Sequence, residues 1–192
     1  MNTLASAQPS GEQSNDKAHN RAFNWTGWSP REKATLLFVI EPVIDPSRIL
    51  LIEKKRGLGA GLINGPGGRL EPGETPLACA VRETREELCI DVLDPQLIGT
   101  LRFQFVGSGK LSGHSILGYV FHASRFTGTP TETNEAVPLW TPLDAIPYHK
   151  MWKDDALWLP LVIARQPFAG RFVFDDQTML EHDVQTCSID DL

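Results

Sequence analysis

The sequence predicts an α/β fold in which a mixed β-sheet lies between helices. Two observations support this prediction. Short runs rich in β-branched and aromatic residues recur along most of the chain, and two segments with helical character, 75–88 and 154–165, interrupt them. The length of 192 residues and the hydrophobic content of 41% suit one ordinary domain with its own core and a tail.

Residues 1–31 are expected to be an N-terminal tail that is mostly disordered, and residues 32–192 to form the domain. Ser, Asn, Gln and Gly dominate the tail, so it has little apolar surface to bury. The exception is a group of three aromatic residues, Phe23, Trp25 and Trp28. We expect this aromatic trio to anchor the tail on the domain surface rather than to bind a ligand.

The domain should begin with two strands at 34–41 and 48–54. Apolar and β-branched side chains fill both runs, and the turn-forming Pro42 and Asp45–Pro46 separate them. The stretch 57–68 that follows is rich in glycine, so we expect an irregular loop there.

The clearest element is a helix from Thr75 to about Leu88. Thr75 is a good N-cap residue, and the proline at position 76 suits the first helical turn. The apolar positions recur at helical spacing, so we expect a buried face formed by Leu77, Ala80, Val81, Thr84 and Leu88.

The rest of the domain should return to strands and add one more helix. Strands are expected at 97–106 and 115–121, with a shorter one at 139–141 and a closing hairpin at 171–174 and 179–183. Residues 142–146 are expected to form a helical turn. The second helix, 154–165, contains Pro160, which we expect to interrupt or kink it.

Three glutamates of the first helix, Glu83, Glu86 and Glu87, are the strongest functional signal. Their i, i+3, i+4 spacing places them on one helix face. Carboxylates this close repel one another unless a cation lies between them, and Mg²⁺ prefers oxygen ligands of this kind. A glutamate-rich helix face by itself is most often solvated surface, so the flanking residues must decide between the two interpretations.

The flanking residues favour a cation-binding helix face over a solvated surface. The run 65–68, Gly-Pro-Gly-Gly, can bring bare backbone close to a metal or a phosphate, and Glu74 can pair with Arg82. Gly68, Glu74, Arg82–Glu83 and Glu86–Glu87 occur at the spacing of the Nudix box, so the chain resembles the Nudix hydrolases. The resemblance implies the Nudix fold, an α/β/α sandwich with a mixed β-sheet.

Two positions depart from the box. Cys89 stands where glycine is usual, and Thr84 stands where an aliphatic residue is usual. The first change asks a residue with a side chain to follow the helix in a conformation that suits glycine. Neither change removes a carboxylate, so we expect catalysis to survive both.

The resemblance implies a Mg²⁺-dependent pyrophosphohydrolase, with Mn²⁺ as the alternative cation. Glu83, Glu86 and Glu87 would hold the cation, helped by the backbone carbonyl of Gly67 and by Glu135, and Arg82 completes the catalytic set. The general base would be Glu86 or Glu135, and the sequence leaves that choice open.

Outside the box, the chain resembles the animal-type branch of the family that hydrolyses oxidised purine nucleoside triphosphates, over about residues 34–184. The matching segments include 54–57, 59–61, 64–65, 103–107, 151–155, 157–161 and 170–172. This resemblance implies a purine pocket formed by Asn64, Trp152, Asp154 and Asp155, with Phe103 and Phe105 as apolar walls.

The side chains also suit this role by their own chemistry. A Trp ring stacks on a purine, and Asn64 can donate and accept hydrogen bonds. Adjacent aspartates facing one buried base should not both be ionised, so a neutral one would donate to the purine O6 while its charged neighbour accepts from N1–H and the amino group. If the proton moved from one aspartate to the other, the same pocket could bind an oxidised adenine. The competing interpretation of Asp154–Asp155 is a helix cap, and Trp158 is expected to support the pocket.

The expected activity is therefore hydrolysis of 8-oxo-dGTP, 2-oxo-dATP and related triphosphates to the monophosphate and pyrophosphate, which sanitises the nucleotide pool. Leu58 and Ile63 replace aromatic residues of the animal enzymes, and the connection 107–113 is longer, so the pocket rim should differ. The alternatives are a Nudix hydrolase of another nucleotide, such as ADP-ribose, a dinucleoside polyphosphate or an undamaged triphosphate, and an inactive Nudix domain that only binds a nucleotide or a partner protein.

Composition and charge bear on the binding partners and the cellular compartment of the protein. The net charge of -6 offers no electrostatic reason to bind a nucleic acid polymer. No apolar run reaches the roughly 20 residues of a membrane-spanning helix, and the N-terminus lacks a secretory pattern. The 3 cysteines have no metal-ligand spacing, which fits a reducing compartment. We expect a cytoplasmic monomer whose partner is a nucleoside triphosphate.

Overall fold

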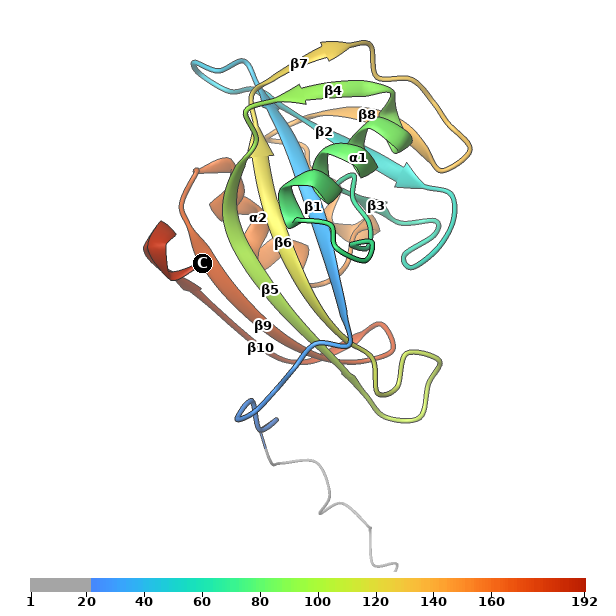
Figure 1. The fold of residues 1–192 in the computed structure, drawn as a ribbon, viewed down its shortest axis with the longest axis vertical. Helices are drawn as coiled ribbons and strands as arrows, with labels where there is room; N and C mark the ends of the chain where they lie inside the picture. Colours follow the sequence, from blue (N-terminus) through green and yellow to red (C-terminus); the bar gives the residue numbers. More distant parts are fainter. Residues whose placement is uncertain (1–21) are drawn as a thin grey trace, which may run out of the picture.

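The computed structural model describes residues 22–192, which are built around a long, twisted mixed sheet (Figure 1). Within these residues the main sheet has 8 strands in the order β10-β9-β5-β6-β1-β2-β3, and β8 also pairs with β2. The strands are β1 (Glu32–Glu41), β2 (Arg48–Lys54), β3 (Ile63–Asn64), β5 (Gln96–Val106), β6 (Ser115–Ala123), β8 (Ala136–Pro142), β9 (Phe168–Asp175) and β10 (Thr178–Thr186). A separate pair of short strands is formed by β4 (Ile90–Leu93) and β7 (Arg125–Gly128).

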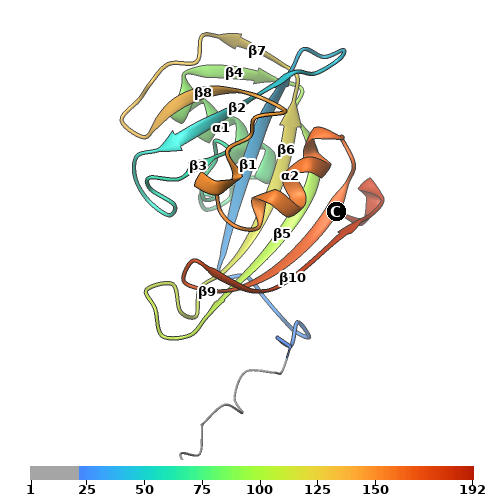
Figure 2. The same cartoon turned by 180° about the vertical axis from the view of Figure 1, so that it is seen from behind.

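Two helices cover opposite faces of the sheet. Figure 1 shows α1 (Pro76–Leu88) in front of the sheet, and Figure 2, from behind, shows α2 (Asp155–Ile163) in front of the other face. Successive side chains of a strand point to opposite faces, so Leu37 packs in the cluster that contains α1, whereas Phe38 packs with α2 residues such as Trp158. The expected α/β/α arrangement is thus confirmed. None of the helices within residues 22–192 has both the length and the hydropathy to cross a bilayer.

Strand β1 is the centre of the domain. It pairs in parallel with β6 and antiparallel with β2, and both of its faces are covered. Its residues 37–40 are almost completely buried, which explains why this run is continuously apolar instead of alternating. The strand therefore gives the loop and helix that pack on it a rigid base.

The predicted buried face of α1 was partly wrong. Leu77 is 46% exposed, and the buried side consists of Cys79, Ala80, Thr84, Glu87 and Leu88. Helical spacing shows which residues share a face, but packing against β1, β4 and β8 decides how the helix is rotated about its axis. This rotation carries Glu87 into the interior.

Several local details of the structure differ from the predictions. Strands β4 and β7 were not foreseen, because each has only 4 residues and they pair with each other apart from the main sheet. At 142–146, where a helical turn was predicted, a single hydrogen-bonded turn forms in which Ala145 N donates to the Pro142 carbonyl at 3.0 Å, and the 3-10 turn η1 (Tyr148–Lys150) follows it. Pro160 lies inside α2 without ending it. A second 3-10 turn, η2 (Ile189–Asp191), closes the chain.

The aromatic trio packs on itself and is held by two strands of the sheet. The ring centroids of Phe23 and Trp25 are 4.9 Å apart, and those of Trp25 and Trp28 are 5.6 Å apart. Trp28 Nε1 donates to Gln104 Oε1 on β5 at 3.0 Å, and Phe23 N donates to the Glu181 carboxylate on β10. The rest of the predicted tail, residues 1–21, lies outside the described residues, so the tail and its boundary stay predictions.

We expect Cys89→Gly to raise the free energy of unfolding by about 1 kcal/mol. Cys89 caps α1 with φ 58° and ψ 34°, a left-handed conformation that crowds a β-carbon and suits glycine. The residue is exposed, so little packing is lost. Urea unfolding followed by circular dichroism measures the change. Cys89→Ser keeps the β-carbon and should give no gain, whereas equal stabilisation by both variants would point to the thiol instead.

Candidate active site

A glycine loop is clamped between β1 and α1. Leu37 N donates to the Pro66 carbonyl at 2.9 Å, and Thr35 N donates to the Gly68 carbonyl at 2.8 Å. A β-carbon on Gly67 would collide with the Thr35 carbonyl, and one on Gly68 would collide with the Glu83 carboxylate. Backbone contact therefore requires glycine at position 67, whereas a side chain at position 68 would displace the Glu83 carboxylate, which lies directly against bare backbone.

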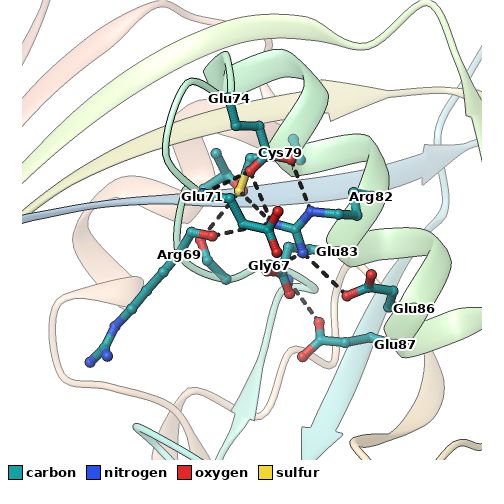
Figure 3. A network of polar contacts seen from close by, with 12 residues as sticks. Gly67, Arg69, Glu71, Glu74, Cys79, Arg82, Glu83, Glu86 and Glu87 are labelled. Atoms are coloured by element: carbon teal, nitrogen blue, oxygen red, sulfur yellow. Dashed lines mark hydrogen bonds and ion pairs between the residues drawn. The ribbon is translucent and has the colours of Figure 1, made fainter.

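Arg82 holds the carboxylates of the loop and the helix in register (Figure 3). Its Nε and Nη2 donate to the two oxygens of Glu74 at 2.9 and 3.0 Å, while Nη1 donates to Glu83 at 2.8 Å and to Glu86 at 3.2 Å. The bond from Arg82, with help from the Glu71 backbone, lowers the pKa of Glu74 to about 2. The pairing of Glu74 with Arg82 expected from the sequence is therefore present.

Glu87 is the buried member of the glutamate set. It is 1% exposed, and its two oxygens accept from Gly67 N at 2.8 Å and from Lys54 Nζ at 2.9 Å. Burial raises the pKa of this carboxyl, and the neighbouring Lys54 opposes the rise. Glu87 thus ties α1 to the glycine loop and to β2.

The other two candidate carboxylates lie closer to solvent. The Glu86 side chain is about half exposed, and Glu135, in the loop before β8, contacts the Arg56 guanidinium. Throughout residues 22–192, no three His, Cys, Asp or Glu side chains are already gathered as a metal cage. Each candidate carboxylate is instead neutralised by Arg82, Lys54 or Arg56.

The donor set nevertheless fits a divalent cation. All of its members are carboxylate or carbonyl oxygens, which hard cations prefer, and the bare backbone at Gly67 and Gly68 leaves room beside Glu83. The lysine and arginines that now neutralise the carboxylates offset the same repulsion that a cation would offset. The carboxylates therefore lie where a divalent cation could be held.

One cavity of about 620 Å³ joins Glu83 and Glu135 to the predicted base pocket, while Glu86 and Glu87 are not among its lining residues. This volume suits a nucleotide-sized ligand. Of the residues predicted from the sequence, those that line the cavity are Asn64, Gly67, Glu83, Phe103, Phe105, Glu135, Trp152, Asp154 and Asp155. Arg82 and Glu87 do not line the cavity. Arg82 donates a hydrogen bond to the lining residue Glu83, and Glu87 accepts one from the backbone of the lining residue Gly67.

Aromatic rings form the apolar wall. Phe103 stacks on Phe172 with centroids 5.5 Å apart, and Phe105 stacks on Phe174 at 5.7 Å. Trp152 meets Phe174 edge-on at 5.9 Å, so its ring is fixed at the cavity edge.

Asp154 and Asp155 are buried side by side at the cavity wall, 2% and 3% exposed. Asp154 accepts from Trp158 Nε1 at 2.8 Å, and Asp155 accepts from Trp152 N at 3.1 Å. Burial raises the pKa of both carboxyls, and the charge of Asp154 raises that of Asp155 further. Two buried carboxyls this close do not both ionise readily, so the pair favours holding one proton between them.

The helix-cap interpretation of Asp154 is wrong. Asp154 is the N-cap residue of α2, yet its side chain makes no capping bond and accepts from the Trp158 indole instead. Asn64, on β3, uses its amide oxygen to accept from Gly65 N at 2.8 Å. Among residues 22–192 its NH₂ group makes no hydrogen bond, so it can donate to a ligand.

Sequence reasoning assigned no role to several cavity residues. These are Glu32, Thr35, Lys54, Arg56 and Arg69. Lys54 and Arg56 could have been found from the sequence, because they are basic residues at the end of a predicted strand and directly before a glycine-rich loop. Trp158, expected to support the pocket, orients Asp154 from one helical turn away. Leu58 does line the cavity, whereas Ile63 lies in the core.

Comparisons with known proteins show the family of the chain. Residues 33–162 match the NUDIX domain family. The chain is 41% identical over 150 residues to the oxidized purine nucleoside triphosphate hydrolase of Mus musculus, covering 78% of this chain and 94% of that protein. The protein of the same name from Danio rerio is 39% identical over 147 residues, with 76% and 92% covered. A mutator MutT protein from Bacillus halodurans shares the fold, with a TM-score of 0.68 at 24% identity over 80% of this chain and 97% of its own.

Proposed function

This chain belongs to the NUDIX domain family, and on that premise we propose that it hydrolyses oxidised purine nucleoside triphosphates to the monophosphate and pyrophosphate. The observation that carries the substrate class is the buried pair Asp154 and Asp155, in the same cavity as Glu83 and the glycine loop. The names of the mouse and zebrafish relatives support the same class.

The base would be read by a donor and an acceptor side by side. Neutral Asp155 donates to the purine O6, while ionised Asp154 accepts from N1–H and the amino group. The Asn64 NH₂ group donates to a further acceptor on the purine edge. If the proton moves to Asp154, the same pair presents the pattern that an oxidised adenine needs.

The phosphates would lie near the glutamates. We propose that Glu83, Glu86, Glu87, Glu135 and the Gly67 carbonyl hold Mg²⁺, which when bound supplies positive charge for the phosphoryl oxygens and polarises the attacking water. Arg82 keeps Glu83 aimed at the cavity, and Lys54 adds positive charge at its wall. Glu86 or Glu135 takes the proton of the water as its oxygen bonds to phosphorus. The bridging P–O bond then breaks, and the products leave.

Removal of damaged nucleotides would serve the cytoplasmic nucleotide pool. The cysteines Cys79, Cys89 and Cys187 are free, which supports our proposal of a reducing compartment. We further propose that the chain acts as a monomer.

A substrate panel tests the proposal. Initial rates with Mg²⁺ are measured for 8-oxo-dGTP, 2-oxo-dATP, dGTP, dATP and ADP-ribose, and the nucleotide products are identified. We expect a strong preference for the oxidised triphosphates with the monophosphate as product. Equal turnover of dGTP and 8-oxo-dGTP, or a preference for ADP-ribose, would contradict the proposed substrate class while leaving hydrolysis itself in place.

Trp152→Ala is expected to raise KM for 8-oxo-dGTP by about 10- to 100-fold with a smaller change in kcat, because stacking a base on an aromatic ring is worth about 1–3 kcal/mol. The Trp152 ring lines the cavity and is held edge-on by Phe174. Steady-state kinetics provide the measurement. Trp25→Ala removes an indole from the N-terminal aromatic trio and should leave KM unchanged. An unaltered KM in Trp152→Ala would show that the base lies elsewhere.

A further inference from the structure

Arg56 and Glu135 form an ion pair at the cavity wall. The Arg56 guanidinium contacts Glu135 Oε1, and both side chains line the cavity. The backbone beneath them is fixed, because Lys55 N donates to the Glu135 carbonyl at 2.8 Å where the β2–β8 ladder ends. Two solvated side chains are thus held opposite each other on a rigid base.

Arg56 differs from the other cations that neutralise the glutamates. The side chains of Lys54 and Arg82 are 17% and 25% exposed, whereas that of Arg56 is 64% exposed. Arg82 is also bound to three carboxylates at once. Arg56 can therefore separate from Glu135 without leaving an unpaired charge buried. Lys54 and Arg82 cannot separate from their carboxylates as readily, because they are less exposed.

We propose that Arg56 is a positioning residue that exchanges partners during substrate binding. In the free enzyme its guanidinium holds Glu135. When a divalent cation and a polyphosphate enter the cavity, the guanidinium turns to the phosphate oxygens and Glu135 turns to the cation. The inference rests on the proposed function, because it requires the glutamates to bind a cation and the cavity to bind a polyphosphate.

The physical basis is competition for one carboxylate. Arginine and the divalent cation both require an anionic oxygen, so each weakens the hold of the other on Glu135. Phosphate oxygens offer the planar guanidinium an alternative pair of acceptors. Loss of Arg56 should therefore strengthen cation binding and weaken polyphosphate binding. Loss of any positive charge at the cavity would change the two affinities in the same directions, so the exchange is identified by the dependence of the cation effect on Glu135.

The test compares the full-length wild type with Arg56→Gln. Mn²⁺ binding without nucleotide is followed by electron paramagnetic resonance of the free ion, and we expect it to become about two- to fivefold tighter, the range of an exposed ion pair. Binding of inorganic tripolyphosphate with Mg²⁺ is measured by calorimetry, and we expect it to become about tenfold weaker, as for a charge-assisted bond. Circular dichroism confirms that the variant is folded.

Two further variants provide controls. Arg69→Gln removes the same charge from the same cavity at a similar exposure of 63%, but Arg69 pairs with Glu32, which is outside the proposed cation ligands. Its effect on Mn²⁺ affinity should therefore be smaller. In a Glu135→Gln background, Arg56→Gln should no longer tighten Mn²⁺ binding. The inference is overturned if Arg56→Gln leaves Mn²⁺ affinity unchanged, matches Arg69→Gln, or still tightens Mn²⁺ binding when Glu135 is absent.

Neither probe contains a base, so this test is independent of the substrate panel. If the affinities for Mn²⁺ and tripolyphosphate change as expected but oxidised purine triphosphates are not preferred, the partner exchange is supported and the proposed substrate class is contradicted. If the panel succeeds and the shifts are absent, the activity stands and Arg56 is only a rim charge.

Discussion

Glu83→Gln is expected to lower kcat by about three orders of magnitude or more without unfolding the protein, because a cation ligand worth several kcal/mol of transition-state stabilisation is removed. The Glu83 carboxylate lies against the Gly68 backbone inside the cavity. Glutamine has the same shape but no charge. Its amide oxygen can still accept from Arg82, which also keeps its two bonds to Glu74, so the loop and the helix should stay in register.

The measurement is kcat at saturating Mg²⁺, combined with Mn²⁺ binding. Glu71→Gln is the matched control, because it removes one carboxylate from an exposed position in the same loop. Its kcat should remain within about twofold of wild type, as for an ordinary surface substitution. If Glu83→Gln retained more than a tenth of wild-type kcat, Glu83 would not be a ligand of the catalytic cation.

Asp154→Asn is expected to lower kcat/KM for 8-oxo-dGTP by about 100-fold or more, whereas Asp155→Asn should cost about tenfold or less. The difference follows from their protonation. In the proposed assignment Asp154 is the ionised acceptor, and an amide in its place removes the charge that two donors of the base require. Asp155 is the neutral donor, and the NH₂ group of asparagine can replace its O–H.

Steady-state kinetics of both variants decide the assignment. The reverse order of losses would show that Asp154 carries the proton when an oxidised guanine is bound. Equal losses would show that neither aspartate is specialised. Asp155→Ala is the accompanying control: it removes the donor altogether and should cost more than Asp155→Asn.

The pH dependence of kcat/KM provides an independent check on the same pair. Burial and the charge of Asp154 raise the pKa of Asp155, so Asp155 is protonated below its raised pKa and loses the donor proton as the pH rises through it. We therefore expect kcat/KM for 8-oxo-dGTP to fall on the alkaline side. Asparagine does not titrate, so this alkaline fall should disappear in Asp155→Asn. An unchanged alkaline limb in that variant would assign it to another group.

Much of the glutamate site could be predicted because it is local. Thr75 and Pro76 define the start of α1, and the spacing of Glu83, Glu86 and Glu87 follows from the helical repeat. The glycine run before the helix indicated bare backbone, and the structure shows why a side chain would not fit there. Such features depend on neighbours within a few residues, which the sequence displays directly.

The pairing of distant residues was not accessible in the same way. Lys54 meets Glu87 across 33 positions, and Arg56 meets Glu135 across 79 positions. These contacts follow from the register between β2 and β8 and from the packing of α1 on the sheet. A one-residue shift of either strand would turn the side chains to the other face.

By itself, the sequence determined the family, the α/β/α arrangement and the identity of the glutamate helix, because these are encoded in periodicity, capping and a motif of fixed spacing. Only the tertiary structure decided which side of α1 is buried, which cation faces each carboxylate, and that both aspartates of the pocket are buried with raised pKa values. The physical reason is that burial and charge act through space. Asp154 and Asp155 are neighbours in the chain, but burial raises the pKa of both carboxyls, the charge of Asp154 raises that of Asp155 further, and the bond from the Trp158 indole opposes the rise at Asp154.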